Sequence, residues 1–289
     1  MSNKLLVIGA TNIDIFTTTS SPYLINDSNP AKVNIGIGGV GCNIATNLNT
    51  LNNEVHFITA LGNDLFAELA KNHFQKRGIN IENSLDYNHS SSVYLGVMDE
   101  DNDLFLGIND MDIVKQLKVS FLQGKHDFIS EFNIIVIDNN LSVDTIEYLV
   151  KTYNHKTIIM DAVSAKKVTK LRNLLKYITV LKVNRLELSV LSKEATVKEQ
   201  ITDLLNEGLK EILVTDKEKD VFYANKTELI TVKPYDKEVI VNASGAGDAF
   251  ISGFTHGVNQ GLTINEKLEQ ALKLANLTLD VTTSTIEKE

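Results

Sequence analysis

Short apolar runs and amphipathic segments alternate along most of the chain. Residues 5–8 form a continuous apolar run that ends at Gly9, which is typical of a buried parallel strand. Similar runs recur further on, and helical periodicity falls between them. We expect strands at 5–8, 55–60, 133–137, 157–160, 177–183 and 211–214, and helices at 44–51, 63–78, 143–153, 197–205 and 266–280. This alternation predicts βαβ units, and therefore an α/β fold with a mostly parallel central sheet.

Two stretches depart from the alternation. Residues 15–35 are rich in hydroxyl side chains and hold two of the three prolines, so they predict a strand and a loop that leave the main sheet. Residues 93–98 and 104–108 flank a polar turn and predict a hairpin. We expect the segments at about 15–38 and 90–110 to form a small β lid on a single domain spanning 1–289. Two more strands are expected at 220–224 and 228–233.

Polar residues follow several of the predicted strands. In open α/β sheets, ligands bind beyond the carboxyl ends of the strands, so these side chains are candidates for one shared site. They are Asn12 and Asp14 after the first strand, and Asp138, Asn139, Asp161, Asn184 and Thr215 after later strands.

Residues 241–254 carry the strongest local indication of chemistry. Small residues precede a helical pattern that begins with Asp248, and Ser244 is the expected N-cap. The amides of Gly245, Ala246 and Gly247 would then be free to bind an anion, typically a phosphate. The helix dipole would keep Asp248 ionised, so that it could accept a proton beside that phosphate. This combination indicates phosphoryl transfer, although a tight turn followed by a favourably placed acid would give the same pattern.

Residues 36–41 form a second glycine-rich stretch, which matches the pattern GxGxxG. A dinucleotide site needs a strand before such glycines and an acid at the end of the next strand. Glu54 lies at the beginning of the next strand instead. We therefore favour glycines that let the backbone approach a polar ligand, with Asn43 reaching that ligand from the helix start.

Composition excludes several classes of function. The chain of 289 residues has 43% hydrophobic and 22% charged residues, which is ordinary for a globular protein. A net charge of −9 makes nucleic acid or an anionic membrane improbable as the main partner. One cysteine, Cys42, excludes an intramolecular disulfide framework. With no apolar run of about 20 residues and too short an apolar N-terminus for a signal peptide, we expect a cytoplasmic protein.

Several motifs together resemble those of one known family. Residues 242–254, NASGAGDAFISGF, closely resemble the C-terminal signature of the ribokinase-like carbohydrate and nucleoside kinases, also called the PfkB family. Residues 38–43 with 61–64 resemble the family's first signature, and residues 184–187, NRLE, resemble its Asn-x-x-Glu motif. The resemblance covers nearly the whole chain. It implies a ribokinase-like three-layer α/β/α sandwich and ATP-dependent phosphorylation of a hydroxyl group.

Two further stretches, 93–99 leading into 109–113 and 161–167, are similar to the pseudouridine kinases within this family. The resemblance then implies transfer of the ATP γ-phosphate to the 5′-hydroxyl of pseudouridine. A kinase for another nucleoside or for a sugar such as ribose or fructose remains open. So does a non-catalytic protein that binds such a ligand.

The resemblance also implies residue roles. Asp248 would be the general base, with Gly245, Ala246 and Gly247 as the anion hole. Asn184 and Glu187 would organise Mg²⁺ and the phosphates of ATP, Glu187 through water, with Thr215 beside the nucleotide. Lys167 would contact the base or ribose, or would simply be a solvated helix lysine. The substrate would be held by Asn12, Asp14, Gly38, Gly39, Asn43 and Lys167.

The sequence departs from the family pattern in two places. Residues 215–220, TDKEKD, lack the two glycines usual before the nucleotide, which leaves the geometry of ATP binding open. Asn242 and Ala243 replace an Asp-Thr pair that helps relatives to bind a monovalent cation, so K⁺ dependence stays open, with Asn242 as the candidate ligand. Lid strands of relatives pair in dimers, which implies a homodimer formed through the lid.

Overall fold

The computed structural model describes residues 4–101, 103–217, 219–237 and 239–286. Within these residues the largest sheet has eight strands. Neighbouring strands are parallel from β12 to β4, and the pairs β12–β13 and β13–β14 are antiparallel. Across the sheet the strands are β14 (Leu229–Val232), β13 (Val221–Asn225), β12 (Glu211–Thr215), β11 (Val180–Asn184), β10 (Thr157–Asp161), β9 (Ile134–Asp138), β1 (Lys4–Ile8) and β4 (Glu54–Ile58).

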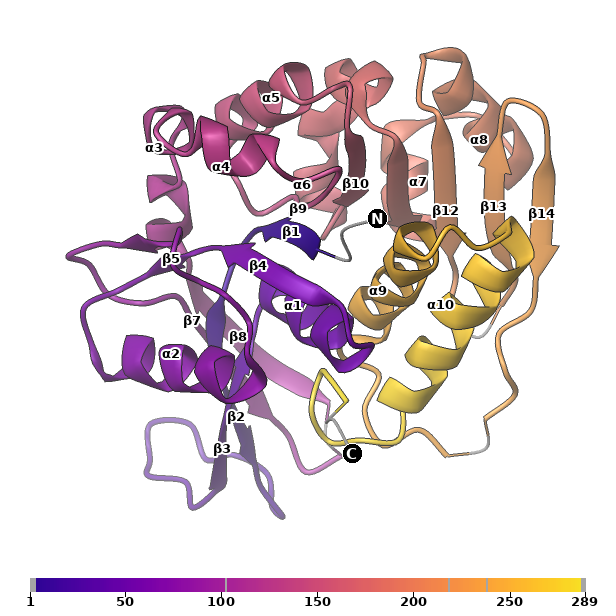
Figure 1. Cartoon of the computed structure of the whole chain (residues 1–289). Helices are drawn as coiled ribbons and strands as arrows, with labels where there is room; N and C mark the ends of the chain where they lie inside the picture. The colour runs from indigo at the N-terminus through magenta and orange to yellow at the C-terminus, as the bar shows by residue number, and fades with distance from the viewer. Residues whose placement is uncertain (1–3, 102, 218, 238, 287–289) are drawn as a thin grey trace.

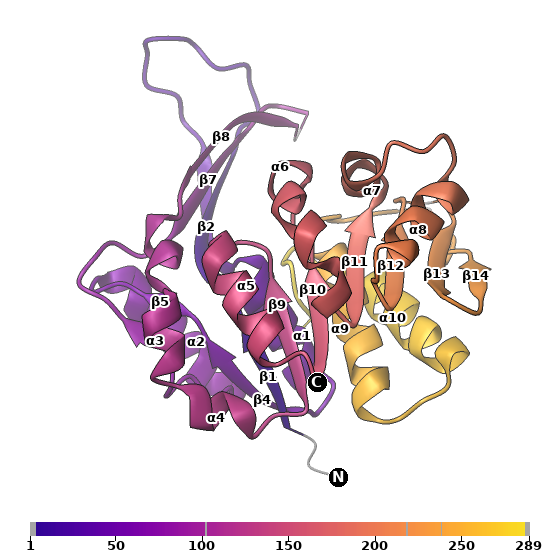
Figure 2. The same ribbon diagram turned by 90° about the horizontal axis from the view of Figure 1, so that it is seen from above.

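Helices cover both faces of this sheet and give three layers (Figure 1). One face carries α1 (Val40–Thr50), α2 (Leu65–Arg77), α9 (Ala246–Asn259) and α10 (Ile264–Thr278). The other face carries η1 (Asp112–Gln116), α3 (Val119–Gln123), α4 (His126–Ser130), α5 (Val143–Thr152), α6 (Ala165–Val168), η2 (Thr169–Tyr177), α7 (Arg185–Leu191) and α8 (Val197–Asn206), as Figure 2 shows from above. No helix among the described residues is both long and apolar enough to cross a bilayer.

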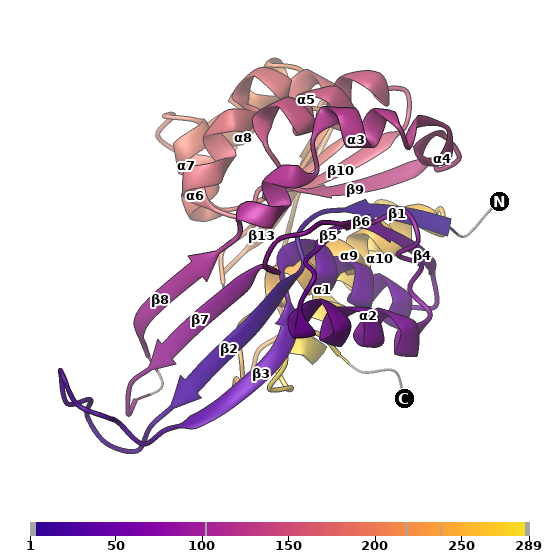
Figure 3. The ribbon, with the colours of Figure 1, turned by 90° about the vertical axis from the view of Figure 1, so that its left-hand side faces the viewer.

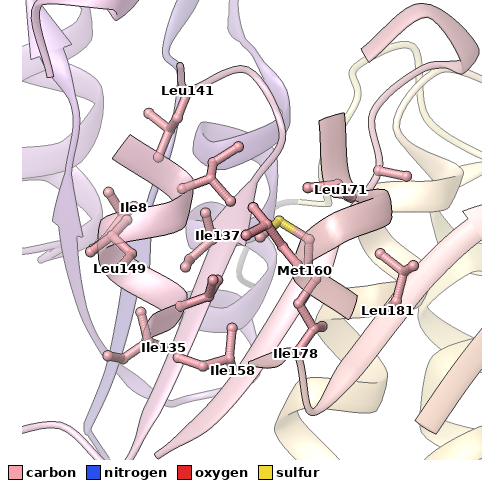
Figure 4. Close-up of a cluster of buried hydrophobic side chains, with 14 of the residues drawn as sticks. Ile8, Ile135, Ile137, Leu141, Leu149, Ile158, Met160, Leu171, Ile178 and Leu181 are labelled. Carbon is pink, nitrogen blue, oxygen red and sulfur yellow. The ribbon is translucent and has the colours of Figure 1, made fainter. Parts of the chain in front are cut away.

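The buried strands explain the two helical layers. Side chains alternate between the faces of a strand, so a run that is apolar at every position supplies two cores. On β1, Leu6 and Ile8 belong to one cluster and Leu5 and Val7 to the other. Figure 4 shows the first cluster, in which Ile8, Ile137 and Met160 of neighbouring strands lie beside Leu149 of α5.

A second sheet, which we call the small sheet, projects from the sandwich (Figure 3). Its strands, in order, are β3 (Lys32–Gly38), β2 (Asn12–Thr18), β7 (Val93–Met98) and β8 (Leu104–Asp110). A third, two-stranded sheet pairs β5 (Ala60–Leu61) with β6 (Leu85–Asp86). The predicted strand and loop at 15–35 are therefore two paired strands joined by a loop.

Most predicted elements are present, with shifted ends. The helix expected at 44–51 begins at Val40, because Gly39 has a φ of 93° and precedes the first helical turn. The strand expected from residue 177 begins at Val180, because residues 169–177 form the helix η2. The short helices α3, α4, α6 and α7 were not predicted, because segments of four to seven residues carry too little periodic pattern.

Candidate active site

A cavity of about 810 Å³ lies where the carboxyl ends of the central strands face the small sheet. Seven of the predicted site residues line it: Asn12, Asp14, Gly39, Asn43, Lys167, Gly245 and Asp248. These residues come from distant parts of the chain: Asn12 and Asp248, which both line the cavity, are 236 positions apart. Asn12 and Asp14 belong to β2 of the small sheet rather than to the end of the first strand, so the small sheet itself forms one wall.

Asp248 lies in the first turn of α9 and is almost completely buried. Its Oδ2 accepts a hydrogen bond from Asn43 Nδ2 at 2.8 Å. Burial raises the pKa of Asp248 to about 7, the carboxylate of Asp161 adds to this rise, and Lys182 opposes it. The expectation that the helix dipole keeps Asp248 firmly ionised is therefore wrong, because loss of hydration outweighs the dipole. A carboxyl with a pKa near 7 is suited to exchange a proton at neutral pH.

Asp14 faces the same cavity from β2, and burial raises its pKa to about 6. Gly38 lies on β3, where it pairs with Asn12, and a Cβ at Gly38 would come within 2.0 Å of Asp14 Oδ2. Gly38 therefore does not line the cavity but leaves the space that the Asp14 carboxylate occupies.

Two amide oxygens in the cavity wall have no protein partner. Asn12 Oδ1 and Asn43 Oδ1 are buried and accept no hydrogen bond from any residue that the structure describes. Buried polar atoms are nearly always paired, so unpaired acceptors beside a cavity indicate a ligand that carries hydrogen-bond donors. Hydroxyl groups of a sugar are such donors.

Aromatic side chains of the small sheet form another wall. The rings of Phe16 and Tyr94 lie 5.8 Å apart and both line the cavity, together with Met98 and Leu104. Phe16 lies across Gly96 of the neighbouring strand, where a Cβ would come within 2.6 Å of its ring. Sequence reasoning missed this wall, although alternate positions of the predicted hairpin and the glycine at 96 were available to indicate it.

Lysines occupy the rim opposite the aromatic wall. Lys166, Lys167 and Lys170 all line the cavity from the α6–η2 segment. The Lys167 ammonium donates to Asn140 Oδ1, and burial lowers its pKa despite the nearby carboxylate of Asp138. Burial also lowers the pKa of Lys170, to about 8. Lys167 is thus a half-buried side chain held at the cavity and not a freely solvated helix lysine.

The start of α9 differs from the expected cap. Gly245, with a φ of 82°, is the N-cap, and no side chain caps the helix. The Ser244 amide instead donates to Asn242 Oδ1 at 2.8 Å, which turns Ser244 away from the capping position. A Cβ at Gly245 would lie 2.2 Å from the Ser284 carbonyl oxygen, so only glycine fits beneath the C-terminal segment. Ala246 N approaches Ala243 O at 3.5 Å, which is a weak contact that leaves this amide nearly free.

Asn184 and Glu187 form a closed pair at the start of α7. Asn184 caps the helix, and the Glu187 carboxylate accepts hydrogen bonds from Asn184 N at 2.7 Å and Asn184 Nδ2 at 2.8 Å. Glu187 is only 2% exposed. Burial raises the pKa of Glu187, while the Asn184 amide and Lys182 oppose the rise. Thr215 ends the adjacent strand β12, and none of these three residues lines the cavity.

The remaining predicted residues lie close to α9. Asn242 uses both polar atoms within the protein, since Oδ1 accepts from Ser244 N and Nδ2 donates to Thr282 O at 3.0 Å. Ala246 and Gly247 follow Gly245 in the first turn but do not line the cavity. In the loop that lacks glycines, Lys217 takes a φ of 50°, and Asp216 lies 3.7 Å from Arg185 Nε.

The stretch 36–41 does not form a dinucleotide site. Gly36 and Gly38 belong to β3 of the small sheet and not to a strand of the parallel sheet. Gly41 is needed for close packing, because a Cβ there would lie 2.8 Å from Gly9 Cα. Of this stretch, Gly39 and Val40 line the cavity, and Asn43 lines it from the first turns of α1, where its amide nitrogen donates to Asp248.

Residues 2–287 match the sequence profile of the pfkB family carbohydrate kinases. The chain belongs to this family. Membership implies a phosphotransferase that acts on an alcohol group and uses ATP. The resemblance read from the sequence is thereby confirmed, and a dehydrogenase is set aside.

Known pfkB-type kinases resemble the chain over most of its length. It is 28% identical to the pseudouridine kinase of Escherichia coli strain K12, over 95% of this chain and 90% of that protein. It is 27% identical to the guanosine-inosine kinase of Exiguobacterium acetylicum, over 94% of this chain and 93% of that protein. The structure of Arabidopsis thaliana ribokinase complexed with ribose and ATP superimposes with a TM-score of 0.86 at 19% identity, covering 100% of this chain and 97% of that one. The ribokinase-like fold of this pfkB protein is therefore established.

Proposed function

We propose that this protein is an ATP-dependent kinase that phosphorylates the 5′-hydroxyl of a nucleoside, pseudouridine in the first place. One observation carries the choice of a nucleoside: the cavity joins a polar end, at Asp14 and Asp248, to an aromatic wall, at Phe16 and Tyr94. A free sugar is polar on all sides, whereas a nucleoside has a ribose for the polar end and a flat base for the aromatic wall.

The polar end fits a ribose. In our proposal Asp14 accepts hydrogen bonds from ribose hydroxyls, and the unpaired oxygens of Asn12 and Asn43 accept others. Gly38 leaves room for the Asp14 carboxylate. Gly39 lines the cavity, where its backbone would lie beside the sugar. This arrangement directs the 5′-carbon toward Asp248.

The base would lie along Phe16 and Tyr94, with Lys167 at its edge. Stacking of a base on an aromatic side chain is worth about 1–3 kcal/mol. Pseudouridine is favoured over other nucleosides by the stretches 93–99 and 161–167, which are similar to those of pseudouridine kinases, and by the relative from Escherichia coli. Guanosine or inosine is the second candidate, because the relative from Exiguobacterium acetylicum is almost equally similar.

The proposed transfer is a direct displacement. The 5′-oxygen of the nucleoside attacks the γ-phosphorus of ATP, the bond from that phosphorus to the β-phosphate oxygen breaks, and ADP leaves. The hydroxyl proton passes to the Asp248 carboxylate. The amides of Gly245, Ala246 and Gly247 would hold the negative charge of the transferring group, a role in which one donor is worth about 10²–10³ in rate. The ends of β11 and β12, at Asn184 and Thr215, would lie beside the nucleotide.

We assign Mg²⁺ to the ATP phosphates, with Glu187 reaching it through water. Magnesium usually keeps several waters and is bound through substrate phosphates rather than by a protein cage. The chemistry of the Glu187 carboxylate suits a hydrated ion, since each oxygen accepts one hydrogen bond and retains a lone pair. At 2% exposure Glu187 does not fit direct coordination. Bound Mg²⁺ would neutralise phosphate charge.

We propose that the turn at Asn242 binds a monovalent cation such as K⁺. The side-chain oxygen of Asn242 is already bonded to Ser244 N, so the cation would contact backbone oxygens of this turn or a rearranged Asn242. Replacement of K⁺ by Na⁺ in the assay tests the idea, and equal turnover in the two salts would remove it.

The small sheet would act as the lid of the site and also as a dimer interface. Asp14, Phe16 and Tyr94 lie on its cavity face, and alternate residues point to the opposite face. That opposite face is apolar and includes the exposed residues Val33 and Ile35 on β3 and Leu106 and Ile108 on β8. Exposed apolar patches of this kind mark protein interfaces, so we propose a homodimer through this face.

A panel of acceptors tests the proposed function. Turnover with ATP and Mg²⁺ is measured for pseudouridine, uridine, inosine, guanosine, ribose and fructose, and ADP formation without acceptor is subtracted. We expect the highest kcat/KM with pseudouridine. A preference for inosine or guanosine would select the second candidate. A preference for ribose or fructose would reject a nucleoside, and binding without turnover of any acceptor would favour a non-catalytic binding protein.

A further inference from the structure

Lys182 is a buried lysine in the middle of the large sheet, and no motif of the sequence drew attention to it. It lies on β11 between the buried residues Leu181 and Val183 and is 7% exposed. Its Nζ lies 3.1 Å from Asp161 Oδ2, at the end of the neighbouring strand β10. Burying such an ion pair costs several kcal/mol in lost hydration, so apolar packing alone would favour a neutral residue here.

The Lys182 ammonium points at the first turn of α9. A Cβ at Gly247 would come within 2.7 Å of Nζ and 3.5 Å of Cε, so the lysine passes directly against the Gly247 backbone. Gly247 immediately precedes Asp248. A cation is unfavourable at a helix N-terminus, because that end already carries partial positive charge. The position therefore needs a compensating negative charge.

Carboxylates supply part of that charge. Burial lowers the pKa of Lys182, but the carboxylates of Asp161, Asp248 and Glu187 outweigh it and raise the pKa overall. The lysine is thus a cation close enough to Asp161, Asp248 and Glu187 for each carboxylate to raise its pKa.

Asp161 extends the contact to the nucleoside side of the cavity. Its Oδ1 accepts a hydrogen bond from Val163 N at 2.7 Å, and Val163 lines the cavity. Val163 has a φ of 67°, a conformation that is costly for a β-branched residue and persists only where its surroundings enforce it. The Lys182–Asp161 pair thus connects the Gly247–Asp248 turn to a strained residue in the substrate wall.

We propose that Lys182 is a positioning residue for phosphoryl transfer. Its side chain packs against the backbone of Gly247, and its ammonium pairs with Asp161. The ammonium also places a positive charge beside the turn at which the transferring group would bind. The inference rests on the proposed kinase function, in which Asp248 is the base and the Gly247 amide is part of the anion hole.

Two variants separate positioning from simple stability. Lys182→Met removes the ammonium and leaves Asp161 unpaired. The double variant Asp161→Asn/Lys182→Met removes both charges and so restores a neutral interior. Lys156→Met is the control, because Lys156 is a half-buried lysine just before the opposite end of β10, where it bonds Ser130 O. Lys182→Gln replaces Lys182→Met if the latter does not fold.

We expect kcat to fall about 10- to 100-fold in both the single and the double variant, as for a catalytic group displaced by about 1 Å. The KM for the nucleoside should change much less, and Lys156→Met should retain the wild-type kcat. If the double variant regains both the kcat and the melting temperature of the wild-type protein, the role of Lys182 is purely structural. That result would overturn the proposal. So would a kcat within about twofold of wild type in the folded single variant.

Amide hydrogen exchange gives a second readout that does not depend on turnover. We expect residues 245–249 to exchange faster in both Lys182 variants than in Lys156→Met, because the support beneath Gly247 is lost. Unchanged exchange there would contradict the positioning role. Wild-type turnover on the acceptor panel tests the kinase proposal separately, so the two failures are distinguishable.

Discussion

At the scale of single residues, Asp248 owes its properties to burial more than to the helix it begins. A carboxylate at a helix N-terminus normally has a lowered pKa, but Asp248 is buried beside Asp161 and its pKa rises to about 7. Lys182 and Asn43 limit the rise. The pKa of Asp248 thus lies near neutral pH, as its proposed role as general base requires.

The acid limb of the pH profile should report this group. A general base acts only when deprotonated, so kcat/KM should fall tenfold for each pH unit below about 7, the pKa of Asp248, and more steeply below about 6, where Asp14 is protonated as well. Steady-state kinetics from pH 5 to 9 measures the limb, because kcat/KM reflects groups of the free enzyme and substrates. An apparent pKa near 4 for the acid limb would indicate that an ordinary exposed carboxyl group, and not Asp248, is the general base.

Gly38 provides a matched test of Asp14. A Cβ at Gly38 would lie 2.0 Å from Asp14 Oδ2, whereas a Cβ at Gly36, on the same strand, would meet nothing within 4 Å. We expect Gly38→Ala to raise the KM for the nucleoside about tenfold or more, the cost of one displaced hydrogen-bonded charge, with little change in the KM for ATP.

Gly36→Ala should leave both constants unchanged. If Gly38→Ala behaves like Gly36→Ala, Asp14 does not bind the substrate.

The residues that line the cavity were predictable where they belong to a sequence motif, whereas their roles stay predictions. Asp14, Asn43, Lys167 and Asp248 meet in one cavity as expected. Lys182 was not predictable, because its importance comes from contact with Gly247, which is distant in the chain. The capping of α9 was mispredicted at Ser244, because Asn242 takes the Ser244 amide and the chain turns at Gly245 instead.

At the scale of elements, the pairing of β2 with β7 and of β7 with β8 builds the aromatic wall of the cavity. Gly96 and Gly107 are paired across β7 and β8, and they leave room for Phe16 and Tyr94 respectively. Because these two positions carry no side chain, the Phe16 ring and the Tyr94 hydroxyl can lie close to the backbone there. The aromatic wall thus depends on the register in which β2, β7 and β8 pair, and the sequence of one strand alone does not specify that register.

Removal of the Phe16 ring should separate nucleosides from sugars. We expect Phe16→Ala to cost about 1–3 kcal/mol in nucleoside binding, seen as a fivefold or greater increase in KM for pseudouridine. Any residual turnover of ribose should be unaffected, because ribose has no base to stack.

Phe16→Leu keeps an apolar side chain without the aromatic face and should give an intermediate KM. Equal losses with ribose and pseudouridine would contradict base stacking.

The elements themselves were predicted well where they are long and buried. The parallel strands and the helices α2, α5, α8 and α10 follow from apolar runs and from 3.6-residue periodicity. The small sheet was only partly predicted, because strands that are exposed on one face and irregular in composition carry little pattern. The assignment of β2 to this sheet depends on long-range pairing with β7, which links residues about 80 apart.

At the scale of the whole molecule, the small sheet would connect substrate binding to the dimer that we propose. One face of the small sheet lines the cavity, and the opposite face carries the solvent-exposed side chains of Ile35 and Leu106. A homodimer through this face would cover the apolar side chains and restrain the wall that holds the base.

Light scattering on a sizing column tests the assembly. We expect the wild-type protein to have twice the mass of one chain, and Ile35→Glu or Leu106→Glu to shift it to one chain, since a buried unpaired charge opposes association. Leu186→Glu is the control, because Leu186 is exposed on α7, away from the small sheet. A wild-type monomer would remove the proposed interface.

The central claim is that Asp248 removes the proton from a nucleoside hydroxyl while ATP transfers its γ-phosphate. The most direct measurement is the rate of nucleoside 5′-phosphate formation by wild-type protein and by Asp248→Asn, with nucleoside affinity measured on the same samples by calorimetry. Asparagine keeps the shape and the hydrogen-bonding capacity of the aspartate but cannot accept the proton.

We predict that Asp248→Asn binds the nucleoside within a few-fold of wild type and forms product about 10²–10⁴ times more slowly, the usual contribution of a general base. Product formation by Asp248→Asn at a rate close to that of wild type would contradict the account.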